Sequence, residues 1–478
     1  MAETVKKKNW VFIIGVLILS VGMQFANYGG TVPIAGEVAK MNAMAYYVLI
    51  AAQGTLGIML ILPIIGKLTA ILGQRNLILI GILVQLAGRI LMMFCTSWVP
   101  FAAANLLQSL GGGFYTTAAY VLMVVAVEPK ETVKFFGYIA VANALGAIFG
   151  PLVSSAMYSA GGIVGSLAYV SHLPFVAIGF LLVAKDCPNQ KSPDAAKGFD
   201  YLGLVLSVVG LACLVFWLNL VGKMFAWVSA PSSIMLILAV VSLGWTIRRE
   251  TTIAAPAIPL KMFKNKRLAY AFIATMVVAA YATCTTTYCV MWVRMNYSAL
   301  PGATIFNGTY NMAQQIVILI LGTFLGGFIG QRFVKRFRKF GIAAMVVALI
   351  ATLLLCCLAF TGTAADNNLV MVGPVPAGML LIYLATGLGG FASVVNTFAF
   401  PGFWQSNTPR EDIPSGQALY SFGAMFGSVL CNAVAGVVLG TGSDYIRAFV
   451  VGAVFAMIGV IIAFLGFRFS KEEVAAAQ

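Results

Sequence analysis

The chain has 478 residues, of which 61% are hydrophobic and only 9% charged, and its formal net charge at pH 7 is +15. A soluble chain needs about a quarter of its residues charged to cover its surface, so this composition excludes ordinary globular domains and indicates an integral membrane protein. The basic residues lie at the ends of apolar runs, which argues for membrane topology and against a nucleic-acid partner. We expect a multi-pass protein of the cell membrane that contacts lipid.

Apolar runs long enough to cross a bilayer as helices recur along the whole chain. The fourteen spans that we expect are 10–34, 46–66, 77–95, 99–126, 134–157, 163–184, 201–222, 229–247, 268–292, 303–330, 341–360, 374–398, 413–440 and 445–468. Of the 29 Lys and Arg, only Lys40, Lys223, Arg294 and Arg447 then face outward, and Arg89 lies within a span. This asymmetry follows the positive-inside rule and predicts that both termini are cytoplasmic.

Two polar segments divide the run of spans. The two groups of six spans have similar sequence stretches at matching positions. The domains that we expect are a six-helix bundle at 1–184, a cytoplasmic linker at 185–200, an inserted helix pair at 201–247, a basic cytoplasmic linker at 248–267 and a second six-helix bundle at 268–478. The stretch LGGGF at Leu110–Phe114 has a counterpart, LGGF, at Leu388–Phe391 in the fourth span of the second group. Repeated bundles with a site between them are typical of secondary transporters.

Three glycine-containing stretches follow known motifs: GKLTAILGQR (Gly66–Arg75), NLLQSLGGG (Asn105–Gly113) and GAIFGP (Gly146–Pro151). With them the chain resembles the fourteen-helix, drug:proton antiporter-like branch of the major facilitator superfamily. The resemblance covers nearly the whole chain and implies an all-α polytopic fold, with two six-helix bundles and two inserted helices. It also implies that some motif residues act in conformational change, namely Gly66, Gly73, Arg75, Gly146, Gly150 and Pro151.

Several positions depart from the motifs of this branch. Ala70 stands where the loop motif has Asp, and Asn105 stands where the fourth-helix motif has Arg. Ser154 lies where the fifth-helix motif ends in glycine, and Gln24 lies where many drug antiporters carry Asp. The resemblance therefore implies the fold more directly than a proton mechanism or a drug specificity.

The acidic residues lie outside the expected membrane core. Among the 14 Asp and Glu, Glu37 lies at the outer end of the first span, Asp366 and Asp444 lie outside, and the others are cytoplasmic. Carriers of cationic drugs usually neutralise them with buried carboxylates, which also carry the coupled proton. A cavity without such groups favours an anionic or neutral substrate.

Polar and aromatic side chains gather on spans 1, 4, 9, 10, 12 and 13, which the resemblance implies face a central cavity together with span 5. The substrate-binding residues that we expect there are Gln24, Asn27, Gln108, Tyr115, Tyr281, Thr285, Tyr288, Arg294, Asn311, Gln314, Asn396 and Tyr420. The alternative for each is a hydrogen bond to a neighbouring helix. Together they suit an amphipathic ligand.

Three residues are candidates for coupling transport to an ion gradient. Arg89 lies in span 3, His172 is the sole histidine, and Glu37 lies at the outer mouth. The alternatives are that Arg89 snorkels or braces helices, that His172 is structural, and that Glu37 is a solvated acid. Arg89 could also replace the charge that the fourth-helix motif lost at Asn105.

The leading hypothesis is a monomeric secondary transporter that works by alternating access. We expect uptake of an amphipathic organic anion, such as a bile-acid-like steroid acid, together with a proton. The alternative is proton-driven efflux of neutral or cationic drugs. An enzyme is not expected, since the spans lack paired acids and metal-binding motifs. No cofactor and no metal are expected, and a non-transporting sensor of the same fold is a further alternative.

Overall fold

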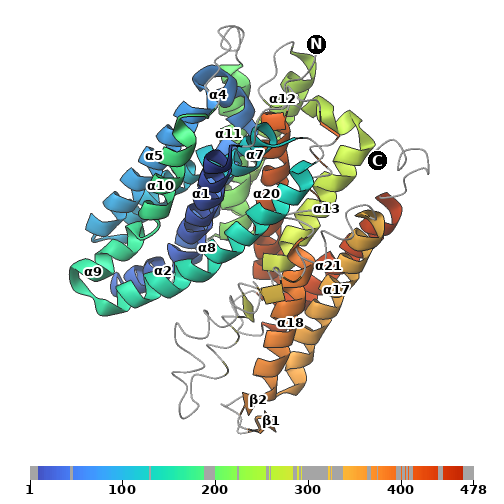
Figure 1. Ribbon diagram of the computed structural model, residues 1–478. Coiled ribbons are helices and arrows are strands. Elements are labelled where there is room, and N and C mark those ends of the chain that lie inside the picture. Colours follow the sequence, from blue (N-terminus) through green and yellow to red (C-terminus); the bar gives the residue numbers. More distant parts are fainter. Residues whose placement is uncertain are drawn as a thin grey trace.

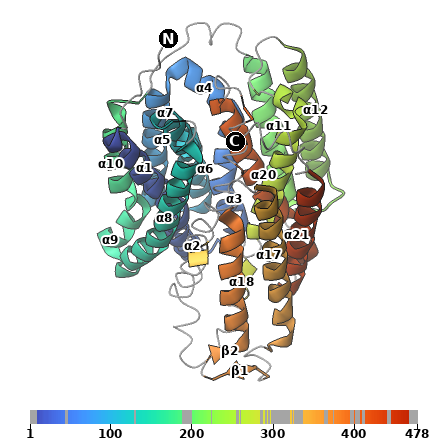
Figure 2. The ribbon, with the colours of Figure 1, turned by 45° about the vertical axis from the view of Figure 1, so that its right-hand side comes forward.

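The computed structural model describes residues 9–466, except for 44–46, 129–130, 188–199, 223–224, 254–257, 259, most of 284–336, 363–367, 374, 395–399, most of 401–412 and 440–444. Almost all regular structure in this part of the chain is helical, because backbone groups in lipid must find partners within the chain. The exception is a small antiparallel hairpin of β1 (Met371–Val372) and β2 (Val375–Pro376). It lies at the end of the molecule opposite to helix α4 (Figures 1 and 2).

The first group of helices surrounds α1 and α6. Its members are α1 (Trp10–Gly29), α2 (Thr31–Lys40), α3 (Tyr47–Ile61), η2 (Leu62–Ile64), α4 (Ile65–Leu72), α5 (Gln74–Phe94), α6 (Trp98–Thr116), α7 (Ala118–Ala126), α8 (Thr132–Ala160), α9 (Gly162–Leu167), η4 (Ala168–Val170) and α10 (Leu173–Ala184). Helix α1 packs against α8 and α10 (Figure 1). Helix α6 packs against both α3 and α5.

The remaining helices form a hairpin and a second group. They are α11 (Tyr201–Leu220), α12 (Ala230–Thr252), η6 (Leu260–Lys264), α13 (Lys266–Thr283), α17 (Phe337–Cys356), η9 (Cys357–Phe360), α18 (Ala377–Val394), α20 (Ile413–Leu439) and α21 (Ile446–Gly466). Helices α11 and α12 pair with each other, α13 packs against α20 and α21, and α17 packs against α18 and α21.

The helices follow the expected spans closely. Within the described part of the chain, ten helices are long and apolar enough to cross a membrane. Each expected span coincides with one or more helices, except 303–330, of which the structure describes only Leu321, Gly322 and Leu325, all three helical. The count of fourteen, the orientation of the termini and the domain boundaries therefore stay predictions. Spans 1, 2, 4 and 6 are not single α-helices, because each contains a turn or a 3-10 segment between two α-helices.

Helix α11 connects the two groups. A cluster of apolar side chains joins α3, α11 and α20, and consists of Leu56, Met59, Leu60, Leu211, Val215 and Val429. Helix α20 also contacts α4 and η2 of the first group. Because lipid is as apolar as these side chains, close packing stabilises such contacts more than the hydrophobic effect does.

Candidate functional site

The first span bends at Gly29 and Gly30, where α1 ends and α2 begins. Pro33 accounts for the bend, because it has no N–H to donate to the carbonyl four residues earlier, at Gly29, and its ring crowds that carbonyl. The N–H of Gly30 still donates to the Ala26 carbonyl at 3.1 Å. The bend therefore leaves carbonyls at the C-terminal end of α1 that can accept further hydrogen bonds.

The guanidinium of Arg89, on α5, reaches this bend. Its Nη2 donates to the Ala26 carbonyl at 2.8 Å, and its Nη1 donates to the Tyr169 carbonyl of η4 at 3.1 Å. The residue is 5% exposed, and its Nε has no hydrogen-bond partner among the described residues. A Cβ at Gly30 would clash with the guanidinium, so this glycine makes room for it. Arg89 points into the protein and does not snorkel to the membrane surface.

The sixth span is interrupted beside the same arginine. It begins as α9, passes through η4 and continues as α10, with His172 as the N-cap residue of α10. The hydroxyl oxygens of Ser171 and Ser154, on α8, lie 3.1 Å apart and share a hydrogen bond. His172 is 3% exposed and lies three residues after Tyr169. A nearby guanidinium opposes a second positive charge, which favours a structural role for this histidine.

Helix α8 packs tightly against α1 through the GAIFGP stretch. A Cβ at Gly146 would clash with the Val21 carbonyl, and a Cβ at Gly150 would lie 2.8 Å from the Phe25 carbonyl oxygen. Pro151 lies inside α8 and is buried. These glycines thus form a close helix contact, while their role in conformational change stays a prediction.

Polar side chains of α6 hold α3. Asn105 donates from Nδ2 to the Ile50 carbonyl at 2.7 Å, and Gln108 donates from Nε2 to the Asn105 Oδ1 at 2.9 Å. Both residues are buried. Asn105 bonds to α3, whereas Arg89 bonds to α1 and η4. The two side chains therefore serve different helix contacts, and Arg89 does not occupy the place of Asn105.

The four tyrosines that we expected to bind substrate are all buried: Tyr115, Tyr281, Tyr288 and Tyr420. Tyr115 donates its hydroxyl to the Gln85 Oε1 on α5, and Tyr281 donates to the Gly389 carbonyl on α18 at 3.3 Å. Such bonds join neighbouring helices, which is the alternative that the sequence left open.

The other expected substrate-binding residues divide into two sets. Gln24 and Asn27 lie half-buried on α1, shortly before its bend, and Tyr288 is buried with its ring centroid 6.3 Å from that of Tyr445. Five lie outside the described residues, and these are Thr285, Arg294, Asn311, Gln314 and Asn396. Of the candidates, Gln24 and Asn27 are thus the ones placed close to Arg89 along the first span.

Glu37 lies on α2, near the end of α8. Its Oε1 accepts a hydrogen bond from the Lys40 ammonium at 2.7 Å and from the Tyr158 hydroxyl at 3.1 Å. The Lys40 Nζ also lies 4.9 Å from the centroid of the Tyr158 ring. The carboxylate is a quarter exposed, with 25% of its side chain accessible. The bond between Tyr158 and Glu37 thus connects α8 to α2.

The loop motif after the second span lies against the second group of helices. A Cβ at Gly66 would clash with Ser415 on α20, so this glycine permits a close contact between the groups. Gly73 has a φ of 82°, a conformation that other residues rarely adopt, and it ends α4. Arg75 is exposed at the start of α5.

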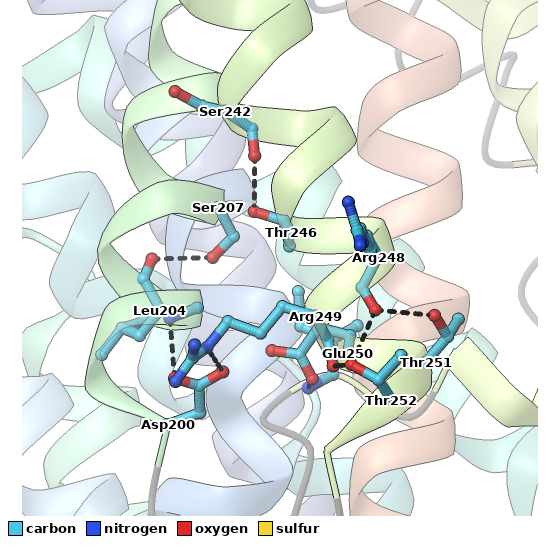
Figure 3. Close-up of polar contacts among 12 residues, drawn as sticks. Asp200, Leu204, Ser207, Ser242, Thr246, Arg248, Arg249, Glu250, Thr251 and Thr252 are labelled. Carbon is cyan, nitrogen blue, oxygen red and sulfur yellow. Dashed lines mark hydrogen bonds and ion pairs between the residues drawn. The ribbon is translucent and has the colours of Figure 1, made fainter.

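A second polar cluster joins the two ends of the α11–α12 hairpin (Figure 3). Asp200 caps α11 by accepting the Gly203 N–H at 3.0 Å, and Arg249 donates from Nε to both Asp200 oxygens, at 2.8 and 2.6 Å. Glu250 is fully buried and accepts the Ile258 N–H at 3.0 Å. The hydrogen bond from Arg249 lowers the pKa of the Asp200 carboxyl below its ordinary value.

The sequence predicted an inserted helix pair at 201–247, but it did not predict the contact between Asp200 and Arg249. The available signal was the position of the charges, since they lie at the two ends of one expected helix hairpin. Among the residues that the structure describes, no three His, Cys, Asp or Glu side chains form a group that could hold a metal ion.

Comparison with known proteins gives the family of the chain. Residues 14–401 match the Major Facilitator Superfamily. The multidrug transporter protein MdtP of Bacillus subtilis is 24% identical over 56% of this chain and 49% of its own length. Multidrug resistance protein 3 of the same organism is 22% identical over 74% of this chain and 67% of its own length. The chain thus spans about half the length of the first of these relatives.

Solved structures agree on the fold. A bacterial homologue of the iron transporter ferroportin in an outward-facing state matches with a TM-score of 0.61 and 12% identity, covering 96% of this chain and 98% of that one. The fucose:proton symporter of E. coli matches with a TM-score of 0.55 and 16% identity, covering 96% of this chain and all (100%) of that one. At these identities the likeness concerns the helical fold alone.

Proposed function

Because this chain belongs to the Major Facilitator Superfamily, a family of membrane transporters and not of enzymes, we propose that it moves an amphipathic organic molecule by alternating access. The chain is a multi-pass membrane protein of helical fold. We further propose fourteen spans with cytoplasmic termini, placement in the cell membrane and a monomeric state.

The distribution of charge supports an anionic substrate. Among the described helices, Arg89 is the single charged residue that lies more than four residues from both ends of its helix. A buried positive charge without a carboxylate disfavours a cation in its neighbourhood and favours an anion. We therefore propose an amphipathic organic acid, with a bile-acid-like steroid acid as the test compound, carried inward with a proton.

A second candidate function is proton-driven efflux of neutral or cationic drugs. The names of two relatives, a multidrug transporter and a multidrug resistance protein, favour it. It requires a carboxylate that reaches the substrate, and such a residue would have to come from a helix end or from outside the described residues.

Glu37 is the coupling residue that we propose. Arg89 keeps its proton at any physiological pH, and a proton on His172 would lie close to that fixed charge. Glu37, in contrast, is a partly exposed carboxylate whose partners, Lys40 and Tyr158, tie α2 to α8. Its protonation would loosen that contact, which gives proton binding a structural effect.

Flux in proteoliposomes tests the choice of substrate. The purified protein is reconstituted, a pH gradient is imposed in either direction, and uptake of a labelled steroid acid and of a cationic dye is measured. Gradient-driven accumulation of the acid is the expected result. Gradient-driven movement of the dye, with no movement of the acid, would overturn the organic-anion proposal in favour of efflux.

Glu37→Gln tests the coupling proposal. We expect this variant to retain exchange of labelled against unlabelled substrate but to lose its response to the pH gradient, because Gln cannot take up the proton. His172→Gln serves as the comparison, since we expect it to keep the response. A normal gradient response in Glu37→Gln would exclude this residue as the proton site.

A further inference from the structure

We propose that Arg89 is a tethered cation, which fixes the bend of the first span against the interruption of the sixth and thereby positions the α1 residues that face the substrate. The inference rests on the proposed transport function for its last step only. In transporters with discontinuous helices, free backbone carbonyls at the helix breaks coordinate the coupling cation. In this chain a guanidinium that belongs to the protein binds carbonyls beside two helix breaks, and the Ala26 carbonyl accepts it in addition to the Gly30 N–H.

The geometry explains why the cation is an arginine. The Ala26 carbonyl belongs to α1 and the Tyr169 carbonyl belongs to η4, and one guanidinium donates to both, at 2.8 and 3.1 Å. A planar fork with separate donors can bridge two acceptors on different helices, whereas an ammonium group acts as a single point of charge. The side chain comes from a third helix, α5, so one residue connects three spans.

The charge of the Arg89 guanidinium is stabilised by the carbonyls near the bend. The carbonyls at the end of α1 carry partial negative charge from the helix dipole, which stabilises a nearby cation. No carboxylate bonds to Arg89, and its Nε has no partner in the described part of the chain. If a change in the bend moved either carbonyl out of reach, the guanidinium would lose an acceptor in a buried place, at a considerable desolvation cost. The bend and the arginine therefore stabilise each other.

The consequence for transport concerns α1. Gln24 and Asn27 lie within one turn of Ala26, so the position of the bend sets where their side chains point. Both are half-buried, in contrast to the fully buried tyrosines. Arg89 is thus a positioning residue, which acts on the substrate through Gln24 and Asn27 and need not touch it.

Amide hydrogen exchange of the full chain in nanodiscs tests the proposal without any substrate. We expect Arg89→Ala to speed exchange on the order of tenfold in peptides that cover 24–33 and 166–176, since two charged hydrogen bonds are lost there. Added guanidinium ion, far below concentrations that unfold proteins, should slow this exchange again by occupying the vacated place. Leu91→Ala is the matched control, because it shortens an exposed side chain on the same helix.

Two results would overturn the proposal. One is unchanged exchange in both peptides of Arg89→Ala, and the other is faster exchange spread over the whole chain that guanidinium does not reverse. If Arg89→Ala cannot be purified, Arg89→Lys takes its place, and we expect faster exchange confined to these two peptides. Full protection of both peptides by Arg89→Lys would contradict the need for a forked cation.

Transport supplies a separate readout. For whichever probe the protein moves, the steroid acid or the dye, we expect Arg89→Lys to raise KM several-fold, while Leu91→Ala leaves KM unchanged. If neither probe is moved, the proposed function fails, yet the exchange experiment still decides the role of Arg89. An unchanged KM together with faster exchange would show that Arg89 holds the bend without positioning Gln24 and Asn27, and would overturn that part of the proposal.

Discussion

Arg89 and Arg249 both bond to a helix end, yet their surroundings differ. Arg249 lies in the last turn of α12, where its side chain is 33% exposed and faces the Asp200 carboxylate. Arg89 is 5% exposed and, among the described residues, bonds only to backbone carbonyls. A charge at a helix end can bond to a carboxylate while part of its own side chain stays in water, whereas a charge inside the bundle depends on fixed dipoles.

This difference determines how each site responds to change. When Asp200 is removed, Arg249 can turn toward solvent, because a third of its side chain is already exposed. When the bend of the first span changes, Arg89 cannot turn toward solvent in this way, because it is buried. We therefore expect substitutions at the Arg89 site to have larger effects than those at the hairpin site, and substitutions at an exposed pair to have the smallest.

The largest effect is expected for Gly30→Ala. The added methyl group would occupy the space of the Arg89 guanidinium, so overpacking should lower the free energy of unfolding by roughly 1–3 kcal/mol. Gly54→Ala is the control, because a Cβ there would meet nothing within 4 Å. Thermal unfolding in detergent compares the two. In an Arg89→Ala background the cost of Gly30→Ala should shrink, and equal costs in both backgrounds would show that these residues are not coupled.

At the hairpin, Asp200→Ala and Asp200→Asn separate two roles of one side chain. Asn caps a helix about as well as Asp, whereas Ala does not, so we expect Asp200→Ala to be less stable than Asp200→Asn by about 1 kcal/mol. Both variants lose the ion pair with Arg249. Urea or thermal unfolding in the same detergent measures the difference. Equal stabilities of the two variants would mean that the hydrogen bond from the Gly203 N–H to this side chain does not stabilise the protein.

The pH dependence of stability tests the ion pair itself. Arg249 lowers the pKa of Asp200 below its ordinary value of 3.8. A carboxyl with a lowered folded pKa stabilises the protein fully above its ordinary value, and this contribution is lost as the pH falls through the folded pKa. The stability advantage of the wild type over Asp200→Asn should thus shrink as the pH drops below about 4. A constant difference down to pH 2 would argue against the pair.

The spans could be predicted because lipid imposes a simple rule: long apolar runs form helices. Gly29 and Gly30 are a separate signal in the sequence, since glycine lowers helix propensity and the first span breaks there. The direction of a side chain around its helix was not predictable, because it depends on how neighbouring helices pack. That is why the role of Arg89 was an open question, and why the sequence did not show that Tyr115 and Tyr281 bond to neighbouring helices.

The hairpin cluster escaped prediction for a related reason. Asp200 and Arg249 are far apart in sequence. The pairing of α11 with α12 brings the Arg249 Nε to 2.6 Å from the Asp200 Oδ2. The position of Asp200 before an apolar run was a readable helix-cap signal. Its partner, Arg249, could not be predicted, because many basic residues lie in the same linker.

The smallest effect is expected for Lys40→Met, at the exposed end of α2. The Lys40 side chain is 65% exposed and its pair with Glu37 is three residues apart on one helix, so water and salt screen it. We expect a loss of at most about 0.5 kcal/mol, which vanishes in high salt. Thermal unfolding at low and high ionic strength measures it. A loss as large as that of Gly30→Ala would contradict the ranking, because exposure would then not decide how strongly a charge is tied to the fold.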